Sequence, residues 1–120
     1  MRNCILVIML FITSNSFSQG EYNTALTIAA KNEQSDELYT ILSYINKSAT
    51  KEFSTNYLMV MVERDKQTKA AIEFHTTIDT NKKLYTFAQK RNTRNNEMLD
   101  CDWVKTMLFI SENKSKIYWK

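Results

Sequence analysis

The sequence predicts an α+β fold in which one or two N-terminal helices pack on an antiparallel meander sheet of four to five strands. Residues 35–47 carry apolar side chains at the spacing of one helical face. Residues 57–78 divide into two apolar segments joined by a short polar one, as in a β-hairpin. Further apolar segments follow, separated by Asn-, Asp- and Ser-containing turns, and they extend the hairpin into a meander.

The beginning of the chain predicts a cleavable signal peptide. Arg2 supplies a positive start, residues 4–12 are an unbroken apolar segment, and residues 16–18 place small side chains where a signal peptidase reads them. The apolar segment is well short of the ~20 residues that span a bilayer, so no stable membrane anchor is expected. We therefore expect a signal peptide over residues 1–18, a single domain over residues 19–120, and a periplasmic or secreted protein.

The charge balance gives no electrostatic reason to expect a nucleic-acid partner. The formal net charge is +3, and signal-peptide removal lowers it by one, because Arg2 is the only charged residue of that segment. The densest basic region, residues 82–94, interleaves Tyr85 and Phe87 with its charges, a pattern that resembles single-strand binding surfaces. Alternation assigns both aromatic residues to the core, which argues against that function.

Cysteine content excludes an intrachain disulfide in the mature protein. The sequence holds two cysteines, and cleavage leaves only Cys101. We predict that Cys101 is a small buried hydrophobic side chain, with an intermolecular disulfide as the alternative. A catalytic thiol is disfavoured because the chain has one histidine to activate it.

Two helices are expected before the sheet. Residues 20–32 have an ambiguous pattern that we interpret as a helix, although their β-branched residues weaken the propensity. Residues 35–47 are clearer, because Ser35 is a suitable cap and acidic residues occupy the first turn. Their apolar side chains fall at i, i+3, i+4 and i+7 and should cover the sheet: Leu38, Ile41, Leu42 and Ile45.

The central hairpin is predicted from residues 57–64 and 69–78, with the turn at residues 65–68. In this register Phe74 points into the core and His75 points to solvent. A third strand is expected over residues 83–91. Three side chains would then form one apolar row beneath the helix: Met59, Phe74 and Phe87.

The C-terminal part allows two interpretations. Residues 92–96 are a polar loop, and residues 97–111 suit either a helix or a buried strand. We favour a strand over residues 103–111, because residues 112–115 form a good turn before a short closing strand at residues 116–119. In its order of elements the predicted domain is similar to cystatin-like and nuclear-transport-factor-like domains. That similarity implies the architecture alone, and it assigns no functional residue.

Glu73 and His75 are the strongest candidates for catalysis. Two residues apart on a strand, they would share one face, which is the minimum for a general acid and base pair. Such a site also needs a third group and a cleft, and the sequence indicates neither. We expect no enzyme activity, no cofactor and no metal site, since zinc requires three or four ligands.

A second group of candidates lies on the sheet face opposite the helix. Leu58, Val60 and Val62 would make that face more apolar than a solvated surface. The covering could be another part of the chain, a ligand or a second protein. We expect a small exported non-enzymatic protein that binds a protein partner, as an inhibitor or protective factor. The alternative is a small-molecule-binding domain with an apolar pocket on this face, in which Glu73 and His75 are further candidates.

Overall fold

The computed structural model describes residues 20–31 and 36–119, and this part of the chain is mostly helical. The predicted signal peptide over residues 1–18 lies outside the described residues. No helix in the described part is long and apolar enough to cross a membrane. The elements, in order, are α2 (Glu21–Lys31), α3 (Asp36–Phe53), α4 (Tyr57–Thr77), η2 (Ile78–Thr80), α5 (Lys82–Arg91), β1 (Thr93–Arg94), β2 (Glu97–Cys101), α6 (Trp103–Asn113) and η3 (Ile117–Trp119).

The predicted α+β class is therefore wrong. The described residues form five α-helices, and their one sheet is the two-stranded antiparallel hairpin β1–β2. Without a meander sheet, the similarity to cystatin-like and nuclear-transport-factor-like domains also fails. The two N-terminal helices are confirmed as α2 and α3, and α3 continues to Phe53, beyond its predicted end at Lys47.

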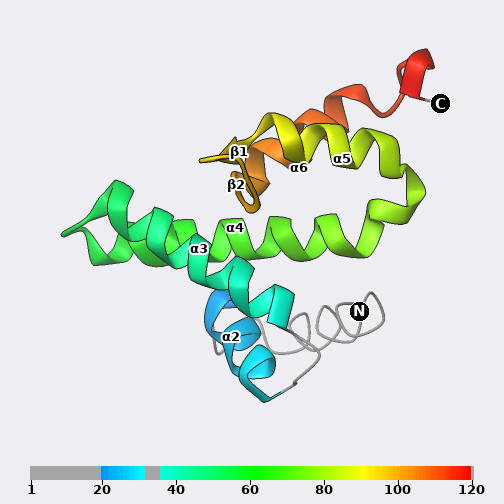
Figure 1. The fold of residues 1–120 in the computed structure, drawn as a ribbon. Helices are drawn as coiled ribbons and strands as arrows, with labels where there is room; N and C mark the ends of the chain where they lie inside the picture. The colour runs from blue at the N-terminus through cyan, green and yellow to red at the C-terminus, as the bar shows by residue number, and fades with distance from the viewer. Residues whose placement is uncertain (1–19, 32–35, 120) are drawn as a thin grey trace.

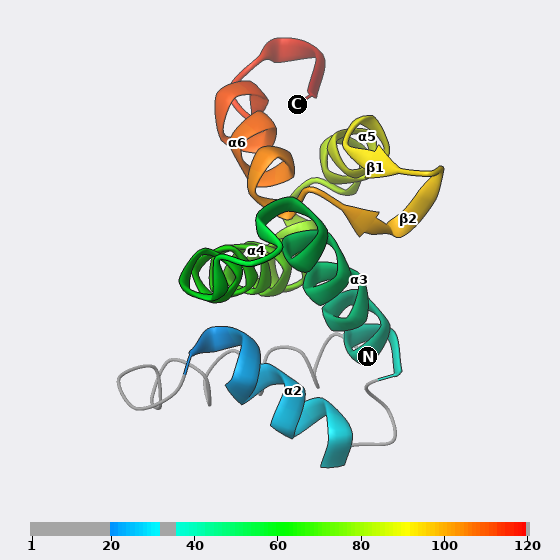
Figure 2. The ribbon, with the colours of Figure 1, turned by 90° about the vertical axis from the view of Figure 1, so that its left-hand side faces the viewer.

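The long helix α4 is the centre of the arrangement. In Figure 1, α3 crosses in front of α4, α2 lies below it, and α5, α6 and the hairpin lie above it. Figure 2 shows α5 and α6 above α4, with α6 packed on α4 and α5 packed on α6, while α2 lies on the opposite face of α4. The α3–α4 connection extends past the end of this packed region (Figure 1).

Helix α4 occupies the residues for which a hairpin was predicted. The side chain of Asn56 caps it by accepting a 3.2 Å hydrogen bond from Met59 N–H. Residues 65–68, the expected turn, contain neither Gly nor Asn, which tight hairpin turns require, and they continue as helix. Two of them, Gln67 and Thr68, are buried in the interior.

The later predicted strands are also helical. The expected third strand is α5, where the side chain of Asn81 accepts a hydrogen bond from Leu84 N–H at 3.2 Å. Residues 103–111 belong to α6, so the favoured strand is wrong. The helical alternative for residues 97–111 is confirmed only in this part, because residues 97–101 form β2. The expected closing strand at residues 116–119 contains the short helix η3.

The one hairpin falls where a polar loop was predicted. Arg94 pairs with Glu97, and the two residues between them, Asn95 and Asn96, have φ of 54° and 58°. Positive φ at both central residues is the geometry of a type I′ turn, which asparagine tolerates better than most side chains. The hairpin returns the chain to the N-terminus of α6.

One core joins α2 to α6, and Phe74 is at its centre. The Phe74 ring lies 5.3 Å from the Tyr85 ring and 5.2 Å from the Trp103 ring, measured between centroids. The predicted inward position of Phe74 is confirmed, but the predicted row is wrong, because Met59 and Phe87 are exposed. The largest fully buried apolar side chains are Trp103, Phe74, Ile41, Leu42, Ile72 and Leu84.

Candidate functional site

The structure does not bring the candidate pair Glu73 and His75 together. Both residues lie on α4, where a separation of two positions corresponds to a rotation of about 200° around the helix axis. Glu73 is exposed, whereas the His75 ring packs against the Trp103 ring at 5.3 Å between centroids. The predicted solvent-facing position of His75 is therefore wrong.

Both ring nitrogens of His75 face hydrogen-bond acceptors. Nδ1 lies 2.8 Å from the backbone oxygen of Ala71, and Nε2 lies 3.4 Å from Oε1 of Glu37. Only the imidazolium form can donate to both acceptors at once. The hydrogen bond from His75 lowers the pKa of Glu37, while burial acts in the opposite direction. Sequence reasoning missed Glu37, because this partner lies on a different helix.

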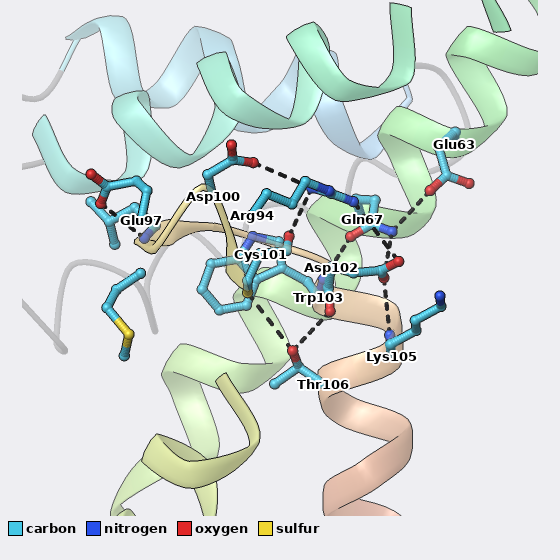
Figure 3. A network of polar contacts seen from close by, with 12 residues as sticks. Glu63, Gln67, Arg94, Glu97, Asp100, Cys101, Asp102, Trp103, Lys105 and Thr106 are labelled. Atoms are coloured by element: carbon cyan, nitrogen blue, oxygen red, sulfur yellow. Dashed lines mark hydrogen bonds and ion pairs between the residues drawn. The ribbon is translucent and has the colours of Figure 1, made fainter. Parts of the chain in front are cut away.

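Gln67 is the centre of a polar network between α4 and α6 (Figure 3). Its Nε2 donates to Oε2 of Glu63 and to Oδ1 of Asp102, both at 2.9 Å. Its Oε1 accepts a 2.7 Å hydrogen bond from Trp103 N–H, the first backbone amide of α6. The buried amide of Gln67 thus makes two hydrogen bonds to the start of α6 and one within α4.

Arg94 extends this network to the hairpin (Figure 3). Its Nη1 lies 3.3 Å from Oδ1 of Asp100, and its Nη2 lies 3.8 Å from Oδ2 of Asp102. Asp102 also caps α6, because its Oδ1 accepts from Lys105 N–H at 3.1 Å. Arg94 therefore bridges the carboxylates of Asp100 and Asp102, and it joins the hairpin to the start of α6.

Cys101 is buried, as predicted, beneath the same network. Its Sγ lies 3.7 Å from Oγ1 of Thr106. Burial raises the pKa of the Cys101 thiol to about 12. At neutral pH this thiol is therefore almost entirely protonated, whereas the thiolate is the nucleophilic form. No group of three or more His, Cys, Asp or Glu side chains within the described residues could hold a metal ion.

The apolar candidates on α4 point in different directions. Val60 is buried, whereas Leu58 and Val62 are 72% and 51% exposed. They cannot line a pocket on a second sheet face, because helix α4 stands where that sheet was predicted. Their exposed neighbours Tyr57 and Met59 complete a patch that we call the α4 tip: Tyr57, Leu58, Met59 and Val62.

A second surface feature lies between α5 and η3. It is an open groove of about 460 Å³, lined by cationic side chains and by the rings of Phe87 and Trp119, which we call its aromatic floor. The Phe87 ring lies 5.2 Å from the Trp119 ring and 5.7 Å from the Phe109 ring. We call this feature the α5–η3 groove, and its lining residues are Lys82, Lys83, Thr86, Phe87, Lys90 and Trp119.

The sequence contained part of the signal for this groove. Residues 82–94 form a basic region with Phe87 interleaved, but strand alternation predicts that Phe87 lies in the core. In the structure Phe87 is 47% exposed. Trp119 was assigned to a closing strand, and its proximity to Phe87 depends on tertiary packing that no local pattern encodes.

Comparison with known proteins gives no assignment. No protein-family model matches the chain, and no curated protein or solved structure matches it significantly. The two surface features and the internal polar network are therefore the basis for any proposal about function.

Proposed function

We propose that this chain is a small exported, non-enzymatic binding protein that engages a protein partner through the α4 tip, as an inhibitor or protective factor. The observation that supports this function is the exposure of four large apolar side chains on consecutive turns at one end of the molecule. Tyr57, Leu58, Met59 and Val62 are 67%, 72%, 39% and 51% exposed. Single exposed apolar residues are common, but several within the first two turns of one helix are more typical of an interaction surface.

The position of the α4 tip fits contact with another protein. The α3–α4 connection extends beyond the packed body (Figure 1), so α2, α5 and α6 lie away from the tip and only α3 is beside it. Ala49 and Val60 are buried there, which ties the first turns of α4 to α3 and keeps the patch on an ordered helix. Leu58 and Val62 are four residues apart and form one stripe, as in helices that dock into a partner's groove.

The test is competitive photo-crosslinking on the native cell envelope or culture medium. A photoreactive residue replaces Met59, and captured proteins are identified by mass spectrometry. An excess of the unlabelled wild-type protein should abolish the captured band, and Leu58→Glu should compete at least about tenfold less well, as expected when a central apolar contact is lost.

Leu108→Glu is the matched control. Leu108 is also an exposed leucine, at 56%, but it lies on α6, away from the α4 tip. This variant should compete as well as the wild-type protein. Equal competition by Leu58→Glu and wild type, or absence of a specific captured protein, contradicts the proposed function.

A further inference from the structure

We infer that the α5–η3 groove is a second docking site, which takes an acidic amphipathic peptide segment of a partner protein, with an apolar side chain between flanking carboxylates. This inference goes beyond the proposed function, because the groove and the α4 tip lie on different elements. It depends on the charges around the groove, on its aromatic floor and on its open shape.

The cationic side chains are arranged in two rows along α5. One row is Lys82, Thr86 and Lys90, and the other is Lys83, Phe87 and Arg91, each with a spacing of four residues. Eight residues of helix correspond to a rise of about 12 Å. Positive charge therefore stands at both ends of each row, and the centre of the groove is an exposed threonine and the Phe87 ring.

Helix α5 itself contains no Asp or Glu that could compensate this positive charge. Lys82 has Asp79 at 3.7 Å, so its charge is already partly compensated. The Lys83 ammonium lies 6.0 Å from the centre of the Trp119 ring, and the Arg91 guanidinium lies 5.2 Å from the centre of the Phe109 ring. The first contact holds the Lys83 charge beside the aromatic floor without neutralising it, and the second holds the Arg91 charge just outside the lining of the groove.

The shape of the groove favours a peptide over a small molecule. Pockets for small ligands enclose most of the ligand surface, whereas this groove is open to solvent along its length. A peptide needs to bury only one face, and a helical or extended acidic segment can place carboxylates toward both ends of α5. The complementary sign of charge selects acidic segments and speeds their association.

The aromatic floor argues against a stacked nucleobase. The Trp119 and Phe109 rings already lie beside Phe87, at 5.2 and 5.7 Å between centroids. Single-strand binding proteins instead present open ring faces to successive bases. The exposed part of Phe87 suits contact with a Leu or Phe side chain of the peptide.

The direct test is fluorescence anisotropy with a labelled peptide of twelve residues, in which Leu-Phe-Leu is flanked on both sides by Glu residues. The same peptide with Gln in place of Glu is the probe control. The full-length chain should bind the Glu peptide at least about tenfold more tightly than the Gln peptide, and the preference should shrink as salt rises. Equal binding of the two peptides, or no binding of either, overturns the inference.

Variants of the groove residues test whether the Glu peptide binds in the α5–η3 groove. Lys83→Gln combined with Lys90→Gln should weaken binding of the Glu peptide about tenfold, since two charge contacts are lost. Lys47→Gln combined with Lys51→Gln removes the same charge from exposed positions on α3 and should leave binding unchanged. Thr86→Glu should also weaken binding of the Glu peptide. It is an independent check, because it adds a negative charge to the groove without removing any of its cationic groups. If the α3 pair weakens binding as much as the α5 pair, the inference is wrong.

Two further probes distinguish other anionic partners. Vesicles containing phosphatidylglycerol and a single-stranded oligothymidine should bind more weakly than the Glu peptide, and the α5 variants should affect them less. Tighter binding of either probe, sensitive to Thr86→Glu, overturns the peptide inference. Leu58→Glu should leave peptide binding unchanged, so failure of this inference and failure of the α4-tip proposal are separate outcomes.

Discussion

The side-chain oxygen of Gln67 accepts a 2.7 Å hydrogen bond from the backbone N–H of Trp103, and this contact fixes the start of α6 against the middle of α4. Trp103 is fully buried, so its backbone amide has no access to water. A buried donor without a partner is costly. The polar network of Figure 3 is therefore a structural joint between α4, the hairpin and α6.

Gln67→Leu should lower the free energy of unfolding by about 1 to 3 kcal/mol, because it leaves the Trp103 amide without an acceptor. Urea unfolding followed by circular dichroism measures the loss. Lys69→Leu, at an exposed position on the same helix, should change the stability by less than about 0.5 kcal/mol. Equal stability of the Gln67 variant and the wild type would show that another group accepts the hydrogen bond from the Trp103 amide.

The stabilities of two variants, Phe74→Ala and Phe87→Ala, distinguish the observed fold from the predicted sheet. The sheet placed both rings in one buried row, whereas the structure buries Phe74 and exposes Phe87. Phe74→Ala should cost about 3 to 5 kcal/mol, as for other buried aromatic residues. Phe87→Ala should cost less than half as much, and similar losses from both variants would contradict the helical arrangement.

Helix α3 was predictable, because its buried residues follow one apolar stripe. Helix α4 was not recognised, because the inward stripe includes polar residues. Gln67 and Thr68 are buried between Val60 and Ala71 and interrupt the apolar periodicity. In addition, Ala70, Ile72 and Phe74 alternate by chance as in a strand.

Local composition did contain the correct signal for α4. Residues 63–73 are rich in Glu, Lys, Arg, Gln and Ala, all of which favour helices. The expected turn also lacked glycine and asparagine. The pairing of His75 with Glu37 had no local signal, since it joins two helices through their packing.

The burial of Cys101 predicts slow alkylation. The thiol has a pKa of about 12, and the folded protein holds it away from solvent. At pH 8 iodoacetamide should modify Cys101 only as the protein opens, so 6 M guanidinium should accelerate the reaction by orders of magnitude. Mass spectrometry of the Cys101 peptide measures the extent of modification. Equally fast alkylation in native buffer would show that the thiol is exposed.

The lowered pKa of Glu37 predicts a pH-dependent contribution to the free energy of unfolding. Its pKa is lowered in the folded protein by the hydrogen bond from His75. The carboxylate therefore stabilises the fold above its unfolded pKa, which is about 4.3, and this stabilisation is lost as the pH falls through the lowered folded value. Glu37→Gln should be less stable than the wild type at pH 6, and the two unfolding free energies should converge as the pH falls through the lowered folded pKa of Glu37.

Glu73→Gln is the matched control for this pH dependence, because Glu73 is an exposed carboxylate on α4. Its unfolding free energy should stay within about 0.5 kcal/mol of the wild-type value across the same range. His75→Gln should reproduce the Glu37→Gln effect near pH 6 and make the second substitution nearly neutral, because either change removes the same contact. Full additivity of the two substitutions would mean that the 3.4 Å contact between His75 and Glu37 contributes nothing to stability.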